Sequence, residues 1–279
     1  MLLGVIGWPI AHSRSPAMHD AAIRALGLDA SYLPMAVPPE ALPDAILGLR
    51  ALGFRGVNVT LPHKRACLDL LDEVDDAARA IGAVNTLVFE QGRSRGSNTD
   101  AAGMVAALRD AGIALKDARV VVLGAGGAAR AAVYAAATSG ATGVHVAARR
   151  EAQAHVLVDS LRDQLPGDLL SAGDLTIDLR ARFEHADLLI QATSATLGES
   201  QAAQAFAATL PMDALPRDAS VFDMVYEPRV TSVLARAEAR GLRCVGGLGM
   251  LLHQGALAFE AFTGQTADIE AMRAALASH

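Results

Sequence analysis

The segment "VVVLGAGGAAR", Val120 to Arg130, decides the fold class of this chain. A short apolar run typical of a buried strand leads directly into glycines and then into an alanine-rich helical stretch. Gly124, Gly126 and Ala129 match the G-x-G-x-x-G/A pattern in that context. Gly124 permits a tight turn, Gly126 admits phosphates close to the backbone, and Ala129 lets the helix pack on the sheet. We therefore predict a dinucleotide site on the helix amides. Its candidate contacts are Gly124, Ala125, Gly126, Gly127 and Ala128.

The residues after the next predicted strand indicate which dinucleotide binds. NAD sites usually carry an acidic residue there for the ribose hydroxyl, whereas NADP sites use arginine for the 2′-phosphate. Here "HVAARRE" places Arg149 and Arg150 at that point, with no carboxylate before them. Two guanidinium groups favour NADP. NAD remains possible, because Glu151 could neutralise one arginine or both could be solvated surface charges.

Outward from this segment, apolar runs of strand length alternate with helical stretches along the chain, which predicts an α/β class with mostly parallel sheets. The expected strands are residues 2–7, 31–37, 56–61, 83–89, 143–148, 186–193 and 219–226, together with the first part of the segment 119–140, which continues into the glycine-rich turn and a helix. Ser15 followed by Pro16 predicts a helix capped by the Ser15 side chain and running to about Leu26. A bridging helix is expected over 97–112, and helices return from Leu248 onward.

The composition predicts a globular protein of two domains that acts on a small molecule. The chain has 279 residues, 52% of them hydrophobic, and a net charge of -6, so no overall basic field attracts nucleic acid or an anionic membrane. Cys67 and Cys244 lack metal-ligand spacing and are expected to be ordinary buried thiols; no metal site is expected. No run of 18 apolar residues and no charged segment before the first apolar residues are present, which predicts a cytoplasmic location.

Several short motifs together resemble one enzyme family. They are "SRSPAMH" (13–19), "NVTLPHK" (58–64), "GAVNT" (82–86), "NTDAAG" (98–103), "GAGGAAR" (124–130), "DMVYEPRVT" (223–231) and "GGLGMLLHQGALAF" (246–259). Their order and spacing resemble those of shikimate dehydrogenases over nearly the whole chain. The resemblance implies a reversible NADP-dependent reduction of 3-dehydroshikimate to shikimate. It also implies a substrate domain of residues 1–101, completed by 247–279, an inserted Rossmann-like NADP domain of 102–246, and a monomer or homodimer.

The resemblance assigns roles to individual residues. Lys64 would donate the proton during reduction, and Asp100 would hold the substrate hydroxyl and the ammonium. This pair agrees with the chemistry, since hydride transfer to a ketone builds negative charge on oxygen and needs a proton donor beside it. The substrate-binding positions implied by the family are Ser13, Ser15, Thr60, Asn85, Tyr226 and Gln254, and two further cofactor contacts are Met224 and Gly247.

The surroundings of Lys64 also carry expectations from the residues themselves. Pro62 suits the first turn of a helix, so Lys64 is expected near a helix amino end, where the macrodipole disfavours an extra positive charge. His12 and His63 stand close to these motifs, but they lack a paired ligand and are expected to be surface or packing residues.

The chain also departs from the family pattern. In the nucleotide-specificity loop, Ala148 and Gln153 replace an asparagine and an arginine; Gln191 replaces an asparagine near the expected nicotinamide, and Ala101 and Gly246 replace a glycine and an aspartate. Two alternatives therefore stay open. One is an NAD-dependent quinate/shikimate dehydrogenase, against which the paired Ser13 and Ser15 favour shikimate. The other is a non-catalytic dinucleotide-binding regulator, against which the retention of both Lys64 and Asp100 argues.

Overall fold

The computed structural model describes residues 1–162, 164–165 and 167–278. The chain divides into two compact units. Unit one comprises Met1–Gly103 together with the chain from Leu251 onward, and unit two comprises Met104–Met250. Two helices, α4 (Asp100–Asp110) and α10 (Leu248–Thr263), contain the points where the chain passes from one unit to the other.

Unit one is built on a mixed six-stranded sheet in the order β2-β1-β3-β5-β6-β4. Its strands are β1 (Leu2–Gly7), β2 (Ser31–Ala36), β3 (Phe54–Val59), β4 (Glu73–Val74), β5 (Thr86–Glu90) and β6 (Arg93–Ser97). Strand β1 runs parallel to β2 and β3, but β5 is antiparallel to both β3 and β6. The β5–β6 connection is Gln91–Gly92, with φ of 51° and 75°, the left-handed pair that a two-residue hairpin requires. This sheet is therefore less parallel than the sequence pattern indicates.

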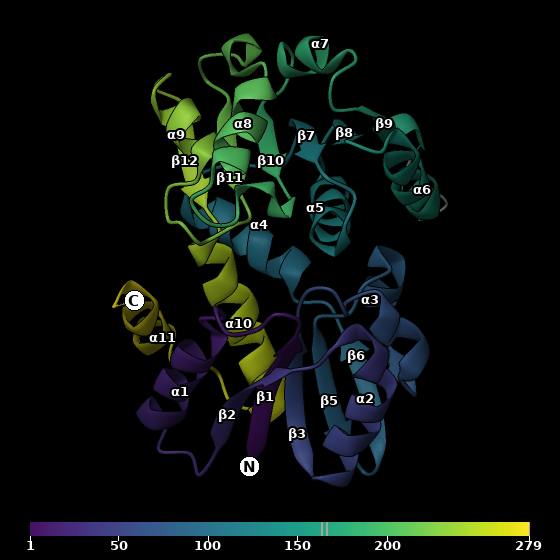
Figure 1. Cartoon of the computed structure of the whole chain (residues 1–279), viewed down its shortest axis with the longest axis vertical. Coiled ribbons are helices and arrows are strands. Elements are labelled where there is room, and N and C mark those ends of the chain that lie inside the picture. Colours follow the sequence, from purple (N-terminus) through teal and green to yellow (C-terminus); the bar gives the residue numbers. More distant parts are fainter. Residues whose placement is uncertain (163, 166, 279) are drawn as a thin grey trace. The chain divides into compact units, whose positions relative to one another are not determined.

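Helices cover both faces of the unit-one sheet. They are α1 (Ser15–Ala25), α2 (Leu42–Ala51), α3 (Asp76–Ile81), α11 (Ile269–Ala277) and the second half of α10, with 3-10 turns η1 (Pro39–Ala41) and η2 (Ala66–Leu70). On one face, Ile46 and Leu49 of α2 share a buried core with Val57 and Val59 of β3, and Figure 1 shows α2 lying along these strands. On the other face, the Phe262 ring of α10 occupies the space over Gly56, where a Cβ would collide with it.

Unit two contains a fully parallel six-stranded sheet in the order β12-β11-β10-β7-β8-β9. Its strands are β7 (Arg119–Leu123), β8 (Gly143–Ala148), β9 (Leu170–Asp174), β10 (Leu188–Gln191), β11 (Ser220–Asp223) and β12 (Arg243–Gly246). The order reverses between β7 and β10. In such sheets ligands bind beyond the carboxyl ends of the strands at the reversal. The expected α/β class is confirmed in both units.

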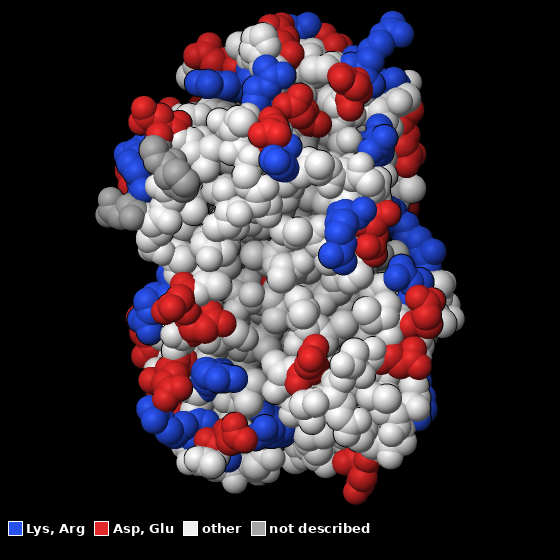
Figure 2. Space-filling view, turned by 180° about the vertical axis from the view of Figure 1, so that it is seen from behind, with Lys and Arg blue, Asp and Glu red and all other residues white. Residues whose placement is uncertain are grey.

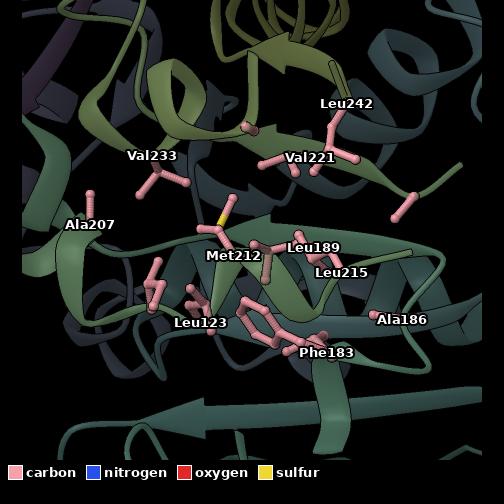
Figure 3. Packing of buried hydrophobic residues seen from close by; sticks show 14 of the residues in the cluster. Leu123, Phe183, Ala186, Leu189, Ala207, Met212, Leu215, Val221, Val233 and Leu242 are labelled. Carbon is pink, nitrogen blue, oxygen red and sulfur yellow. The ribbon is translucent and has the colours of Figure 1, made fainter. Parts of the chain in front are cut away.

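The connections of unit two pack against this sheet. Its helices are α5 (Gly127–Thr138), α6 (Glu151–Arg162), α7 (Leu179–Phe183), α8 (Gln201–Thr209) and α9 (Ser232–Glu238), with 3-10 turns η3 (Gly167–Leu169), η4 (Ser194–Thr196) and η5 (Met212–Ala214). Figure 3 shows one core of the unit, in which Phe183 of α7 and Val233 of α9 contribute to the same cluster as Leu189 and Val221 of the central strands. These side chains are at most 2% exposed. The strands of unit two are therefore held by a closely packed core.

Two local expectations are wrong. The α1 cap residue is Arg14 rather than Ser15, and the Ser15 amide donates to Ser13 Oγ at 3.3 Å. Helix α1 therefore begins at Ser15, one residue earlier than expected. After Pro62 no α-helix begins: residues 61–65 form turns and continue into the short 3-10 turn η2. The helix-dipole argument for Lys64 therefore does not apply.

Charged residues are mixed over the surface. Figure 2 shows Lys and Arg side chains interspersed with Asp and Glu on the face in view, rather than gathered in a basic stripe. Among the described residues, no helix combines the length and apolar character needed to cross a bilayer. Within the same part of the chain, no group of three or more His, Cys, Asp or Glu side chains could hold a metal ion.

Candidate active site

One edge of the unit-one sheet gathers most of the residues that the motifs single out. Lys64 follows the carboxyl end of β3, and Asp100 follows the carboxyl end of β6. Asn85 immediately precedes β5. Because β5 is antiparallel to both neighbours, its beginning lies at the same edge as their ends. Residues from three separate motifs therefore meet at one edge.

Lys64 and Asp100 form a largely buried ion pair. Lys64 Nζ lies 2.6 Å from Asp100 Oδ2, and the two side chains are 17% and 6% exposed. A charge-assisted hydrogen bond of this length holds the ammonium in one orientation. Because the Lys64 side chain is partly exposed, its ammonium can still donate a hydrogen bond to a ligand.

Asn85 connects this pair to its surroundings. Its Nδ2 donates to Asp100 Oδ1 at 2.9 Å, to Thr99 Oγ1 at 3.0 Å and to Gln254 Oε1 at 3.3 Å. Gln254 projects from α10, and its own Nε2 donates to Leu251 O at 3.0 Å. Four of the residues implied by the family resemblance, Lys64, Asp100, Asn85 and Gln254, are thus joined by direct hydrogen bonds.

Asn98 and Thr99 belong to this network and were missed as site residues. The amide of Thr99 donates to Asn85 Oδ1 at 2.8 Å, which fixes the orientation of the Asn85 carboxamide. Asn98 Oδ1 accepts from the Asp100 amide at 3.0 Å, and Asn98 Nδ2 donates to Ala83 O at 2.8 Å. Both residues lie in the motif "NTDAAG", so a signal for them was present in the sequence.

The backbone around Lys64 is held from two directions. The Val84 amide donates to Lys64 O at 2.8 Å. His63 is 1% exposed, and its Nε2 lies 2.7 Å from Val37 O. His63 is therefore a packing residue, one of the two roles expected for it, and it anchors the turn that carries the lysine.

Ser13 lies in the loop after β1, Ser15 is the first residue of α1, and Thr60 directly follows β3. Ser15 is buried, whereas Ser13 and Thr60 are partly exposed. The Thr60 amide donates to Ile6 O at 2.9 Å, so the loop after β3 is tied to β1. Burial raises the pKa of Tyr32, and a hydrogen bond from the Ser15 side chain opposes that rise. Ser15 itself is only 7% exposed and therefore lies against the core.

A chain of buried polar groups leads from Tyr32 to Asn85. The Tyr32 hydroxyl donates to Asn58 Oδ1 at 2.7 Å, and Asn58 Nδ2 donates to Asn85 O at 3.3 Å. The ring of His19 stacks on Tyr32 with centroids 4.1 Å apart and an interplanar angle of 7°. His19 is completely buried, and neither ring nitrogen has a hydrogen-bond partner among the residues that the structure describes. Burial lowers the pKa of His19 to about 3, so the ring packs as a neutral aromatic group.

Unit two presents the glycine-rich turn at the reversal of its sheet. Gly124 has φ of 115°, and a Cβ there would lie 2.8 Å from Thr193 Cγ2, so only glycine suits this position. Gly126 is the cap residue of α5, and a Cβ built there meets no atom of the described residues within 4 Å. The first amides of this 12-residue helix lack partners within the helix, and Gly126 beside them leaves room for a ligand to approach. These features fit a dinucleotide pyrophosphate.

The other candidate cofactor contacts lie around this turn in the same unit. Arg149 and Arg150 follow β8 and are exposed. Met224 and Tyr226 follow β11, and Gly247 follows β12. The Gly247 amide donates to Val225 O at 3.2 Å, which joins the ends of these two strands. Tyr226, a candidate substrate contact, belongs to unit two, whereas the other substrate candidates belong to unit one.

The two cysteines are free thiols. Cys67 is buried, as expected, and burial raises its pKa to about 12. Cys244 is only partly buried, which differs from the expectation; burial and the charge of Glu238 raise its pKa to about 11. A thiol with a raised pKa is a poor nucleophile, so neither side chain is a candidate for the chemistry of the site.

Family models match three segments of the chain. Residues 5–87 match the shikimate dehydrogenase substrate binding domain. Residues 106–221 match shikimate/quinate 5-dehydrogenase, and residues 247–277 match the shikimate 5′-dehydrogenase C-terminal domain.

Individual proteins resemble the chain over nearly its full length. A protein of Geobacter metallireducens named shikimate dehydrogenase (NADP(+)) is 45% identical over 94% of this chain and 91% of its own. The shikimate 5-dehydrogenase of Thermus thermophilus, solved with NADP(H) and shikimate, is 40% identical with a TM-score of 0.86, covering 100% of this chain and 99% of its own. Quinate dehydrogenase from Corynebacterium glutamicum, solved with NAD, is 32% identical with a TM-score of 0.89, covering 100% and 99%.

Proposed function

We propose, from the premise that this chain belongs to the shikimate dehydrogenase family, that it catalyses the reversible NADPH-dependent reduction of 3-dehydroshikimate to shikimate. The observation that carries the proposal is the ion pair between Lys64 and Asp100, 2.6 Å apart at the edge of the unit-one sheet. A chain that only bound a dinucleotide would need no such pair. In this activity the enzyme would supply shikimate for aromatic amino-acid and chorismate biosynthesis.

The proposed chemistry assigns the proton to Lys64. Reduction adds a hydride to the carbonyl carbon and a proton to the oxygen, and NADPH supplies the hydride. Lys64 gives its proton to the developing alkoxide, and in the oxidative direction it accepts the proton of the hydroxyl. Asp100 would hold the ammonium in position and bind a hydroxyl of the substrate. The 2.6 Å contact supports this division of roles.

Neutral groups around the pair would hold the rest of the substrate. Ser13 and Ser15 are proposed to bind the carboxylate, with help from Tyr226, because hydroxyl donors suit an anionic oxygen. Thr60, Asn85 and Gln254 are proposed to bind the ring hydroxyls. The hydrogen bonds of Asn85 to Asp100 and Gln254 support this assignment, since they orient three polar side chains around one point.

The proposed cofactor site lies in unit two. The backbone from Gly124 to Ala128 would bind the pyrophosphate, and Arg149 and Arg150 would bind the 2′-phosphate in bidentate contacts. Met224 and Gly247 are proposed to contact the nicotinamide end. Open space at Gly126 and the exposure of both arginines support this arrangement.

One alternative rests on a specific similarity. Because quinate dehydrogenase, solved with NAD, shares this fold at 32% identity, oxidation of quinate with NAD is the second candidate activity. The arginines after β8 and the pair Ser13 and Ser15 favour shikimate and NADP. A non-catalytic regulator is a weaker candidate, because both Lys64 and Asp100 are present and in contact.

A matrix of initial rates tests the proposal. Purified protein is assayed with shikimate and quinate, each with NADP+ and NAD+, by the absorbance of the reduced nicotinamide. The highest kcat/KM is expected for shikimate with NADP+. A higher value for quinate with NAD+ would favour the second activity, and no turnover with any pair would exclude both.

The organisation of the molecule is part of the same proposal. Residues 1–101 with 247–279 would form the substrate-binding domain, and residues 102–246 the NADP-binding domain. The two compact units support this division. We further propose that the enzyme acts in the cytoplasm as a monomer or homodimer, on small molecules and without nucleic-acid or membrane partners.

A further inference from the structure

A fully buried polar cluster lies beyond the carboxyl ends of β10 and β11. Its members are Gln191, Thr196, Asp223 and Thr231, each 0% exposed. The two strands are parallel neighbours, with Gln191 and Asp223 in register at their last positions. The cluster therefore occupies the place from which both following loops depart.

Asp223 collects neutral hydrogen-bond donors. Thr231 Oγ1 donates to its Oδ2 at 2.6 Å, and Thr196 Oγ1 donates to the same oxygen at 3.1 Å. The Val225 amide donates to Oδ1 at 3.0 Å. Burial raises the pKa of Asp223, and these hydrogen bonds oppose the rise. A buried carboxylate held by neutral donors adds little to stability compared with apolar packing. The main effect of Asp223 is therefore to fix the segments that carry its donors.

Gln191 uses both ends of its carboxamide. Its Oε1 accepts from the amide and the hydroxyl of Thr193, each at 2.7 Å. Its Nε2 donates to Thr196 Oγ1 at 2.7 Å, to Thr193 O at 2.9 Å and to Asp223 Oδ1 at 3.3 Å. One side chain thus fixes the backbone of the loop after β10 and links it to Asp223.

The cluster joins two loops to each other. Gln191 and Thr196 hold residues 192–198, whereas Asp223 holds Val225 and Thr231 of residues 224–231. The Gly198 amide donates to Glu227 O at 3.0 Å, a second link between the same loops. Thr231 also accepts from the Leu234 amide at 3.2 Å and caps α9. The shape of both loops therefore depends on this cluster.

The position of the loops on the sheet indicates which part of the cofactor they would meet. The glycine-rich turn follows β7, the arginines follow β8 on one side of it, and the two loops follow β10 and β11 on the other. Thr193 lies against the turn, because a Cβ at Gly124 would approach Thr193 Cγ2 to 2.8 Å. With the pyrophosphate at β7 and the 2′-phosphate at β8, the nicotinamide half extends over β10 and β11.

We propose that Gln191 and Asp223 are positioning residues that hold the loops after β10 and β11 in the shape that receives the nicotinamide half of NADP(H). The inference rests on the proposed function, since it takes NADP(H) as the ligand of unit two. It assigns a role to Gln191, the residue that departs from the asparagine usual in the family. Neither side chain is exposed, so both act through Thr193, Thr196, Val225 and Thr231 rather than by touching the cofactor.

The test compares two ligands that differ in the nicotinamide half. NADP+ is compared with adenosine 2′,5′-bisphosphate, which carries the adenine and the 2′-phosphate but no nicotinamide. Dissociation constants are measured by calorimetry for the wild type, Asp223→Asn and Gln191→Met. Asparagine replaces one carboxylate oxygen by an amino group, which then faces the hydroxyl donors of Thr196 and Thr231 or the amide donor of Val225. Methionine keeps the length of Gln191 without its hydrogen bonds. We expect about a tenfold or greater loss of NADP+ affinity, as for unsatisfied buried groups, and less than about a twofold change for the bisphosphate.

Milder and matched variants keep the test decisive. Thr231→Val removes the 2.6 Å bond to Asp223 with little change of shape, and it replaces Asp223→Asn if thermal unfolding shows that variant to be unfolded. Thr142→Val removes a bond from an exposed threonine to Asp117 O before β8, and it should leave both affinities unchanged. The Arg149→Ala, Arg150→Ala variant should weaken both ligands, because both carry the 2′-phosphate.

The outcomes separate this inference from the proposed function. Equal loss of both ligands in folded Gln191→Met and Asp223→Asn proteins would mean a general loosening of unit two and would overturn the inference. Unchanged NADP+ affinity would overturn it as well. Failure of the wild type to bind NADP+ would instead reject the proposed function itself.

Discussion

Lys64 Nζ lies 2.6 Å from Asp100 Oδ2, and the second oxygen of that carboxylate accepts from Asn85 Nδ2 at 2.9 Å. The carboxylate thus divides its two oxygens between a cation and a neutral amide. The amide is itself fixed by the Thr99 backbone. This arrangement leaves the Lys64 side chain few orientations. Its position therefore depends on Asp100, Asn85 and Thr99 as well as on its own turn.

Replacing Lys64 by alanine should remove most of the turnover. A positioned general acid or base contributes about 10²- to 10⁴-fold to a rate, so kcat for shikimate oxidation should fall by that order with a smaller change in KM. Steady-state kinetics at neutral pH measure both parameters. Lys116 is the matched control, because it is exposed, and Lys116→Ala should retain wild-type rates. Retention of most turnover by Lys64→Ala would remove the lysine from the proton-transfer step.

Removing Arg149 and Arg150 together should change cofactor preference. Without the guanidinium groups, the KM for NADP+ should rise about tenfold or more, since hydrogen bonds to charged groups are worth about 1.5–3 kcal/mol. The KM for NAD+ should change little, because NAD+ has no 2′-phosphate. Rates with both cofactors at saturating shikimate measure the difference. An equal rise for both cofactors would mean that the arginines do not bind the 2′-phosphate.

His19 should make the stability of the protein depend on pH in the acidic range. Its folded pKa is lowered from 6.5 to about 3, so between these values the unfolded chain binds a proton that the folded chain does not. Stability should therefore fall as the pH falls from 6.5 toward 3, by up to about 1.4 kcal/mol per pH unit for this group. Urea unfolding at several pH values measures the slope.

The matched variants for that experiment are His19→Phe and His185→Gln. Phenylalanine keeps an aromatic ring against Tyr32 and cannot be protonated, so the acid slope should become shallower. His185 is exposed, and its replacement should leave the slope unchanged. The same slope in His19→Phe and the wild type would show that other groups cause the acid sensitivity.

Gly56→Ala should destabilise unit one. A Cβ at this strand position would overlap the ring of Phe262, and overpacking of a core typically costs about 1–3 kcal/mol. Gly48→Ala is the contrasting variant, since Gly48 lies within α2 and a Cβ there meets no atom within 4 Å in the described part of the chain. Alanine should stabilise that helix by about 0.5–1 kcal/mol. Chemical unfolding of both variants measures the difference, and similar stabilities would contradict the proposed contact of Phe262 with β3.

Much of unit two followed from local patterns. The strand, glycine turn and helix from Arg119 to Thr138 lie where the sequence predicts them. Strand ends were less accurate: the runs predicted at 186–193 and 219–226 stop at Gln191 and Asp223. Both polar side chains belong to the buried cluster, and a loop follows each of them. The point where each strand ends therefore depends on partners in the neighbouring strand and its loop. Hydrophobic pattern alone carries no record of those partners.

In unit one too, the motifs predicted part of the candidate site and the structure added the rest. The family prediction from seven motifs is confirmed by the comparisons. The network around Asn85, however, joins residues as far apart as Asn85 and Gln254, and the roles of Asn98, Thr99 and His63 depend on atoms outside their own motifs. The absence of an α-helix directly after Pro62 and the cap at Arg14 rather than Ser15 are further local details that the sequence pattern did not predict.

The sequence by itself determined the α/β class, the glycine turn of a dinucleotide site, two arginines suited to a phosphate, and membership of a family through its motifs. Each of these depends on residues within a few positions of one another, where backbone preference and side-chain period act directly. Only the tertiary structure decided how Lys64, Asp100, Asn85 and Gln254 hydrogen-bond, that His19 is buried without partners, and that Gln191 and Asp223 tie two loops together. Those features arise from contacts across the sheets, whose energies depend on distance and burial rather than on order along the chain.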